Sequence, residues 1–114
     1  MDKQIKGRIG ENLAIKYLIN NGYIILERNK VIYRSNKKWL EIDILASKKG
    51  INYLIEVKYR TSNKFGTVYE TINSKKILKL TQYIESQKTC FIPLLITIQR
   101  VQEKNVINEV LITN

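Results

Sequence analysis

Apolar residues near the start of the chain recur at the spacing of an α-helix. They are four residues apart from Ile5 to Tyr17, and further apolar residues lie beside them on the same helical face. Gly22 follows, at a position where helices commonly end in a left-handed residue. The pattern therefore predicts a helix over residues 4–21.

Five later segments are rich in β-branched residues or alternate between apolar and polar positions, as strands do. They cover residues 23–26, 39–46, 51–59, 91–100 and 106–112. The polar stretch from Ser47 to Gly50 reads as a turn that joins the second and third segments into a hairpin. Pro93 donates no ladder hydrogen bond, so we expect its strand to lie at an edge there or to start nearby.

A second amphipathic helix is predicted over residues 73–87. Ile77, Leu80 and Ile84 are three and four residues apart, with lysines on the opposite face. No repeat or Pro/Gly/Ser-rich linker interrupts the chain, so residues 1–114 read as one domain. The order α-β-β-β-α-β-β predicts an α/β fold, in which a mixed sheet flanked by helices buries the apolar stripe of each helix.

The charge of the chain points to a polyanionic partner. Its 114 residues include 20 Lys or Arg and 10 Asp or Glu, a formal charge of +10. Such a charge attracts nucleic acid through phosphate contacts. Membrane-surface binding is a competitor, although its basic residues usually cluster on one amphipathic helix, and solubility alone is a third explanation. No apolar run is long enough to span a bilayer.

The absence of His and the presence of a single Cys90 exclude several kinds of site. They exclude Ser-His-Asp and Cys-His nucleophiles, His-ligated zinc and thiolate zinc clusters. Any catalysis must then use carboxylates, lysines and hydroxyls. A lone cysteine and a first segment unlike a signal peptide lead us to expect a reducing, cytoplasmic setting.

Three of the ten carboxylates lie inside the two strands with the strongest β pattern. A turn centred on residues 48–49 places Glu41 opposite Glu56, with Asp43 as the diagonal neighbour on the same face. A shift of two residues places Asp43 directly opposite Glu56. A shift of one residue scatters the acids over both faces of the hairpin.

Clustered carboxylates repel one another, and a divalent cation would offset that repulsion. Hard cations with oxygen ligands fit such a cluster, Mg²⁺ first and Mn²⁺ as its substitute, and Lys58 supplies a positive charge beside it. The alternative is a solvated strand face whose glutamates pair with lysines. Glu11 lies at the border of the apolar face of the first helix, so its side chain can point toward the sheet. Taken alone, Glu11 fits the description of a solvated glutamate in the first turn of a helix.

An ordered series of segments carries a family resemblance. Residues 7–14 (GRIGENLA), 41–46 (EIDILA) and 55–60 (IEVKYR) resemble the YraN family of small predicted endonucleases, and the likeness spans about residues 5–100. It implies the PD-(D/E)xK nuclease fold that archaeal Holliday-junction resolvases share. Leu40 stands where the family has glycine, and the stretch from 29 to 41 is longer than usual.

The resemblance also assigns roles to four residues. It implies Asp43 and Glu56 as ligands of one or two Mg²⁺ ions, and Glu11 as a helix-borne acid that serves a second metal or supports the first. Lys58 is the lysine of the signature, which would orient the attacking water or neutralise developing charge.

Two functions remain open at this point. The first is a Mg²⁺-dependent DNA endonuclease that hydrolyses phosphodiester bonds, and a homodimer acting on branched DNA is one form of it. The second is a non-catalytic, basic nucleic-acid-binding module of a DNA repair, recombination or uptake complex. Tyr33 and Trp39 either stack on bases or pack against the core. The candidate phosphate contacts are Lys37, Lys38, Arg60, Lys64, Lys75, Lys76 and Lys79.

Overall fold

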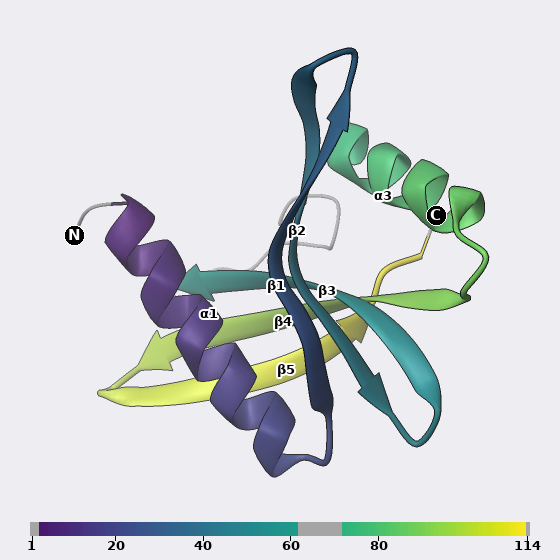
Figure 1. Cartoon of the computed structure of the whole chain (residues 1–114). Helices are drawn as coiled ribbons and strands as arrows, with labels where there is room; N and C mark the ends of the chain where they lie inside the picture. Colours follow the sequence, from purple (N-terminus) through teal and green to yellow (C-terminus); the bar gives the residue numbers. More distant parts are fainter. Residues whose placement is uncertain (1–2, 62–71, 114) are drawn as a thin grey trace.

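The computed structural model describes residues 3–61 and 72–113 and confirms the α/β class with its element order. The elements are α1 (Lys3–Asn20), β1 (Ile24–Arg34), β2 (Lys37–Lys48), β3 (Ile51–Arg60), α3 (Ser74–Ser86), β4 (Phe91–Val101) and β5 (Lys104–Leu111). The described strands form one sheet in the order β1-β2-β3-β4-β5. β3 and β4 run parallel, whereas the other neighbours run antiparallel, so the sheet is mixed (Figure 1).

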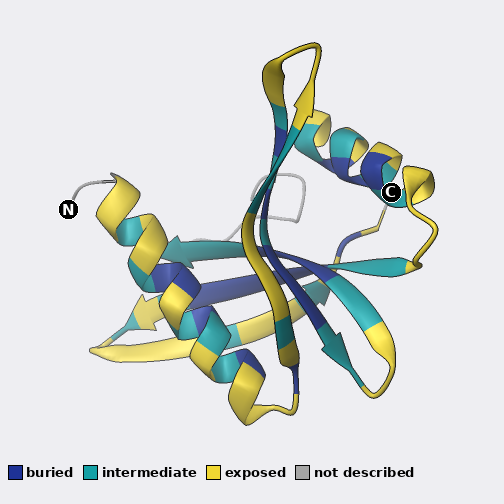
Figure 2. Ribbon diagram, in the orientation of Figure 1, coloured by how far each residue is buried: buried dark blue, intermediate teal, exposed yellow. Residues whose placement is uncertain are grey.

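The core has one apolar cluster on each side of the sheet. Ala14 and Leu18 of α1 belong to the first cluster, and Ile77 and Leu80 of α3 belong to the second. Neighbouring residues 54 and 55 of β3 divide between the two clusters, as the alternation of a strand requires. The middle of the sheet is therefore buried on both faces, while the outer surfaces of the helices are exposed (Figure 2).

The end of α1 and the start of α3 are both capped, and the first cap is the one expected at Gly22. Gly22 has a φ of +87°, and Tyr23 N–H donates to Leu18 O at 2.9 Å, which closes α1 with a left-handed cap. At the start of α3, the Asn73 side chain accepts a hydrogen bond from Lys76 N–H at 2.9 Å. Residue types at helix ends thus fixed the boundaries to within about one residue.

The hairpin between β2 and β3 corrects the register expected from a turn centred on residues 48–49. Lys48 pairs with Ile51, so the turn is Lys49-Gly50, and both of its residues have positive φ, +51° and +78°. Two left-handed residues make a type I′ turn, which suits the twist of a hairpin. The register shifted by two residues is the correct one, and it brings Asp43 opposite Glu56.

Pro93 does not lie at a sheet edge, because β4 runs between β3 and β5. The other expectation, a strand that starts nearby, is confirmed, since β4 begins at Phe91. The ladder with β5 begins only at Leu94, so the missing N–H of Pro93 interrupts no pairing there. Its carbonyl accepts a hydrogen bond from Ile112 N–H at 3.1 Å.

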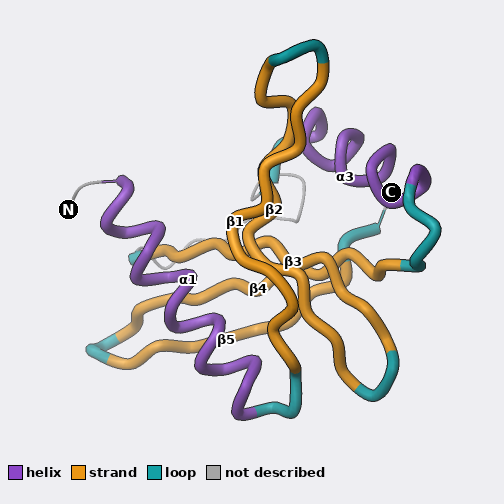
Figure 3. Tube along the Cα trace, in the orientation of Figure 1, coloured by secondary structure: helices purple, strands orange, loops and turns teal. Residues whose placement is uncertain are grey.

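β1 is much longer than the four residues that its apolar pattern indicates. Residues 27–30 are all polar and residues 30–32 are all half-buried, so the alternation of a half-buried strand is absent. Beyond the sheet β1 and β2 continue as a ribbon that projects past α3 (Figure 3). Neither described helix is long and apolar enough to cross a membrane.

Candidate functional site

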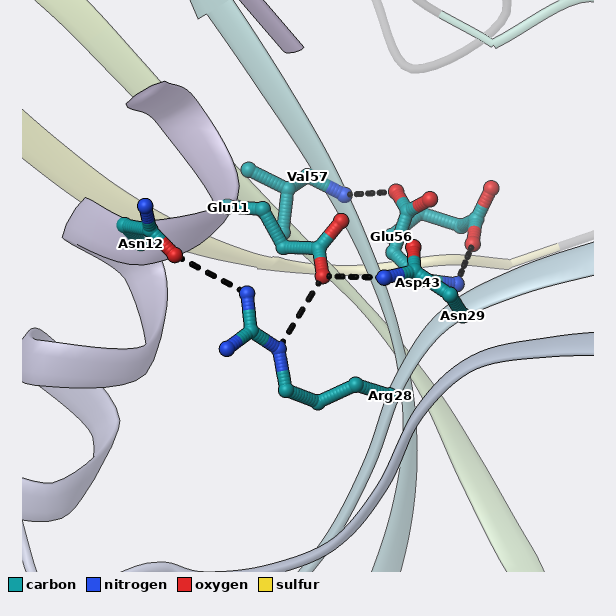
Figure 4. Close-up of polar contacts among 7 residues, drawn as sticks. All are labelled: Glu11, Asn12, Arg28, Asn29, Asp43, Glu56 and Val57. Carbon is teal, nitrogen blue, oxygen red and sulfur yellow. Dashed lines mark hydrogen bonds and ion pairs between the residues drawn. The ribbon is translucent and has the colours of Figure 1, made fainter. Parts of the chain in front are cut away.

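The candidate site lies where β2 and β3 part. Their ladder ends at the pair Ile44 and Ile55, after which β3 continues beside β4. One residue further, Asp43 N–H donates to Oε2 of Glu56 at 3.2 Å, and Val57 N–H donates to Oδ2 of Asp43 at 2.8 Å (Figure 4). Carboxylate oxygens therefore replace backbone acceptors at the point where the strands separate.

The face that β2 buries changes at this same point. Ile42 belongs to the cluster beneath α3, whereas Ile44 belongs to the cluster beneath α1. Residues two apart on a regular strand share a face. The alternation is therefore interrupted at Asp43, and this break lets the strand leave its neighbour.

Glu56 is the most deeply buried acid of the site, with 1% of its surface exposed. Its Oε1 forms an ion pair with the ammonium group of Lys76 on α3. Burial, and then the negative charge of Asp43, raise the pKa of Glu56 to about 7. Burial also raises the pKa of Asp43. A second positive charge close to these two carboxylates would lower both pKa values.

The charges of these acids raise the pKa of both nearby lysines, but the net shifts have opposite signs. Burial lowers the pKa of Lys58, and the nearby charge of Lys76 lowers it further. Burial also disfavours the charged form of Lys76. The charge and hydrogen bond of Glu56, together with the charges of Asp43 and Glu41, outweigh burial, so the pKa of this lysine is raised. Lys76 is thus the ammonium group that neutralises Glu56, a role that the sequence gave no reason to assign.

Glu11 reaches the site from α1 and is 9% exposed. Its Oε1 accepts hydrogen bonds from Arg28 Nε at 3.2 Å and Asn29 Nδ2 at 3.0 Å. Asn29 has a φ of +52° inside β1, a conformation that asparagine tolerates better than most residues. Burial, opposed by the hydrogen bond from Arg28, raises the pKa of Glu11.

A close approach of α1 to β3 sets the depth of Glu11. A Cβ added at Gly10 would lie 2.7 Å from Cβ of Tyr59, so only glycine fits without a shift. The residue next to Glu11 therefore lets the helix lie directly on the strand that carries Glu56 and Lys58. In the sequence, this glycine stands out only as part of the family resemblance.

One cavity of about 360 Å³ brings part of the expected site together. Glu11, Glu41 and Asp43 line it, together with Asn29 and Arg8. Glu56 and Lys58 do not line it. Lys58 instead lines a neighbouring cavity of about 250 Å³ with Tyr59 and Arg60.

The donor set suits a hard cation, although the side chains do not form a closed cage. In residues 3–61 and 72–113, no three Asp, Glu, Cys or His side chains lie close enough together to hold a metal ion. Proteins usually bind Mg²⁺ through one or two carboxylates plus substrate phosphates. Asp43 and Glu56, adjacent and with raised pKa values, fit that pattern once Lys76 withdraws from Oε1.

The expected phosphate contacts divide into several groups. Lys37 and Lys38 are exposed near the end of the ribbon, while Lys75 and Lys79 of α3 line a cavity of about 320 Å³ beside it. Arg60 donates to the carbonyl oxygen of Tyr59 at 3.2 Å. Lys76 pairs with Glu56, as described above, and Lys64 lies outside the described residues.

Trp39 shows which of its two expected roles the fold uses. It packs against the cluster beneath α3, and the Arg34 guanidinium lies 3.4 Å from the centroid of its ring. Tyr33, in contrast, is 66% exposed. Arg28 and Asn29, which hold Glu11, are further residues of the site that sequence reasoning did not single out. Their charge and amide chemistry alone gave no signal, because both lie between the segments predicted as strands.

Comparisons with known proteins agree on one family. The model of the uncharacterised protein family UPF0102 matches residues 10–91. A UPF0102 protein of Fusobacterium nucleatum is 43% identical over 82 residues, which cover 68% of this chain and 65% of the relative. A UPF0102 protein of Persephonella marina is 43% identical over 76 residues, covering 67% and 61%.

A further UPF0102 protein, from Alkaliphilus oremlandii, is 42% identical over 92 residues, covering 77% of this chain and 74% of the relative. The chain thus spans less than two thirds of the Fusobacterium and Persephonella relatives. The matched range of the family model, residues 10–91, includes Glu11, Asp43 and Glu56.

Proposed function

The chain belongs to the uncharacterised protein family UPF0102, and from the geometry of its site we propose that it is a Mg²⁺-dependent DNA endonuclease of the PD-(D/E)xK type that prefers branched DNA. The observation that carries the proposal is the pairing of Asp43 and Glu56 where β2 and β3 part. Two adjacent, desolvated carboxylates with raised pKa values are costly for a merely structural site.

The residues that would hold the cation are Asp43 and Glu56, with Glu11 on the far side of Asp43. Glu11 and Asp43 affect each other's charge, as do Asp43 and Glu56. When bound, Mg²⁺ supplies Lewis-acid relief of the negative charge on a scissile phosphate. All three acids come from different elements, so the fold and not a single loop fixes their spacing.

The remaining residues act on the substrate and on charge. Lys58 is half-buried and has a lowered pKa, so its ammonium group can hold a water molecule or a phosphate oxygen and can exchange a proton more readily than a free lysine. Lys76 keeps Glu56 neutralised in the metal-free chain and must release Oε1 when a cation takes its place. The formal charge of +10 draws the polyanion toward an acidic site that would otherwise repel it.

A second function, a non-catalytic DNA-binding module, rests on one specific observation. The ammonium group of Lys76 already occupies the position on Glu56 that a cation would need. A chain in which this ion pair is permanent would keep the fold and the basic surface without hydrolysis. The two functions differ in one measurable respect, namely cleavage in the presence of a divalent cation.

The experiment is a cleavage assay on a four-way junction, a flap, a single strand and a linear duplex with Mg²⁺ or Mn²⁺. We expect the wild type to cut the branched substrates fastest and to stop in chelator. Asp43→Asn and Lys58→Ala should each lose about a hundredfold or more in rate, because each removes a charge needed in the transition state.

The matched controls are Glu85→Gln and Lys88→Ala, exposed residues outside the site whose replacement changes the charge in the same way. They should cut at nearly the wild-type rate. DNA binding in chelator without cleavage of any substrate would favour the binding module. Absence of both binding and cleavage would contradict both functions.

A further inference from the structure

β1 and β2 extend beyond the sheet as a two-stranded ribbon, which we name the β1–β2 arm (residues 30–42). Its pairs run from Lys30 and Ile42 to Arg34 and Lys37. β2 pairs with β3 only from residue 44 onward, so the arm has no sheet neighbour among the described residues. In Figures 1 and 3 the arm rises away from the sheet and past one end of α3.

The tip of the arm is basic and exposed. A two-residue turn with positive φ at Ser35 and Asn36, +51° and +62°, closes it. Arg34, Lys37 and Lys38 flank this turn, and all three are exposed. No acidic residue occurs between positions 28 and 40. The tip therefore carries three basic side chains on a projecting element, and one of them, Lys38, forms an ion pair with Glu41 at the base of the arm.

The arm is held at a defined angle. A bulge interrupts its ladder, because Ile32 pairs with Leu40 and Tyr33 pairs with Lys38, which leaves Trp39 as the extra residue. Trp39 packs toward the core and its carbonyl accepts a hydrogen bond from Lys79 Nζ at 3.1 Å. The bulge thus ties the base of the arm to α3.

The tip is ordered by the same residue. The guanidinium of Arg34 lies 3.4 Å from the centroid of the Trp39 ring, so the cation stacks on the indole while the side chain remains exposed. An arginine that is already stacked loses less conformational entropy when it binds a ligand. A cationic tip fixed in advance is suited to repeated contact with a regular anionic polymer.

A cavity joins the arm to the candidate site. It has a volume of about 320 Å³ between the base of the arm and α3, and Trp39, Lys75 and Lys79 line it. Glu41 lines both this cavity and the cavity of Asp43 and Glu11. A backbone seated against Lys75 and Lys79 would therefore run on toward the acids.

We propose that the β1–β2 arm enters the major groove of duplex DNA while the adjoining cavity seats one of the two phosphate backbones. The strands of a ribbon lie about 4.8 Å apart, and the major groove is about 12 Å wide and admits such a ribbon, whereas the minor groove is about 6 Å wide. The proposal rests on the proposed function in one respect: it assumes that the bound duplex lies next to the phosphodiester bond that the candidate site cuts.

The test compares Arg34→Gln/Lys37→Gln with a matched control, Lys16→Gln/Lys88→Gln. Each double variant loses two positive charges at exposed positions, at the tip of the arm or away from it. Binding to a labelled duplex and to a single strand is measured in chelator at several salt concentrations, so that no cleavage intervenes. Thermal unfolding verifies that both variants are folded.

The arm variant should bind the duplex about tenfold or more weakly than the wild type, with a salt slope smaller by about two. Its affinity for the single strand should change less than about threefold, as should both affinities of the control. Methylation of guanine N7, a major-groove atom, should be blocked by the wild type and not by the arm variant.

Equal losses for duplex and single strand would overturn groove insertion, and so would an arm variant that binds like the control. A wild type that does not bind duplex would overturn the arm proposal, whereas a wild type that binds and cuts none of the DNA substrates would overturn the proposed function as well. A wild type that binds duplex through the arm but cuts no DNA would contradict only the nuclease function. A wild type that cuts DNA, and whose duplex binding is unchanged when Arg34 and Lys37 are replaced, would contradict only the arm proposal.

Discussion

Lys76 of α3 forms an ion pair with Glu56 of β3, whose side chain is almost completely buried. This contact joins the two layers of the fold at the candidate site. Burying one charge without its partner costs far more than burying the pair. The contact therefore has consequences for stability, for pH dependence and for cation binding.

Lys76→Met should destabilise the protein by about 3 kcal/mol near pH 8, because Glu56 would lose the partner of its buried charge. Near pH 5 the loss should be smaller, since Glu56 with a pKa of about 7 takes up a proton there. Urea unfolding at both pH values measures the difference. Lys75→Met, at an exposed neighbouring position, is the control and should cost less than about 0.5 kcal/mol at either pH.

The stability of the wild type should fall as pH rises from about 5 to about 8. The pKa of Glu56 is raised from 4.5 to about 7, so the folded state holds this proton more tightly than the unfolded chain does. The stability that the proton contributes is fully present below pH 4.5 and is lost as pH rises through the folded value. A shift of this size corresponds to roughly 3 kcal/mol.

Glu56→Gln is the comparison for this pH dependence, and urea titrations in chelator at a series of pH values provide the measurement. In Glu56→Gln, the decrease in the free energy of unfolding near neutral pH should disappear. A remaining fall at lower pH is expected from Asp43 and Glu11, whose pKa values are also raised. A wild type whose stability rises steadily with pH over this interval would show that Glu56 is not protonated by burial.

Gly10→Ala should destabilise the protein by about 1–3 kcal/mol, because the new methyl group would lie 2.7 Å from Cβ of Tyr59. Gly7 lies in the same helix and has nothing within 4 Å of an added Cβ. Gly7→Ala should therefore be neutral or stabilise by up to about 1 kcal/mol, since alanine favours a helix over glycine. Chemical unfolding of both variants tests the close approach that sets the depth of Glu11. Equal effects would contradict it.

Asn29→Ala should cost about 1–2 kcal/mol in free energy of unfolding, because alanine in a left-handed conformation is strained and cannot donate to Glu11. Asn29→Gly keeps the backbone conformation accessible and removes only the hydrogen bond, so it should cost less. Both variants should weaken Mg²⁺ binding if Glu11 supports the cation, as isothermal titration would show. An alanine variant as stable as the glycine variant would argue against strain at this position.

Helix boundaries, the order of elements along the chain and the fold class follow from local sequence patterns, and these could be predicted. Gly22 and Asn73 have the chemistry of helix caps, and both act as caps. Of the three hairpin registers considered, the one centred on residues 48–49 is wrong by one residue at the turn, and the one shifted by two is correct. A glycine at the second turn position favours the two-residue turn Lys49-Gly50.

The arrangement of the site could not be predicted to the same extent. Lys76 and Glu56 are 20 positions apart on different elements, and only tertiary packing makes one lysine of α3 a partner while its neighbour Lys75 stays exposed. The left-handed Asn29 and the bulge at Trp39 are likewise imposed by contacts with α1 and α3. The length of β1 was also missed, because residues 27–30 are all polar and residues 30–32 are all half-buried, which leaves no period of two.

The most direct measurement of the central claim is a crystal structure of the protein soaked with Mn²⁺ and examined by anomalous scattering. We expect a peak with metal–oxygen distances of about 2.1–2.2 Å to carboxylate oxygens of Asp43 and Glu56, and the ammonium group of Lys76 displaced from Oε1. Retention of the Lys76 ion pair with no peak at these two carboxylates, at Mn²⁺ concentrations that fill a site elsewhere, would contradict the assignment of the cation site.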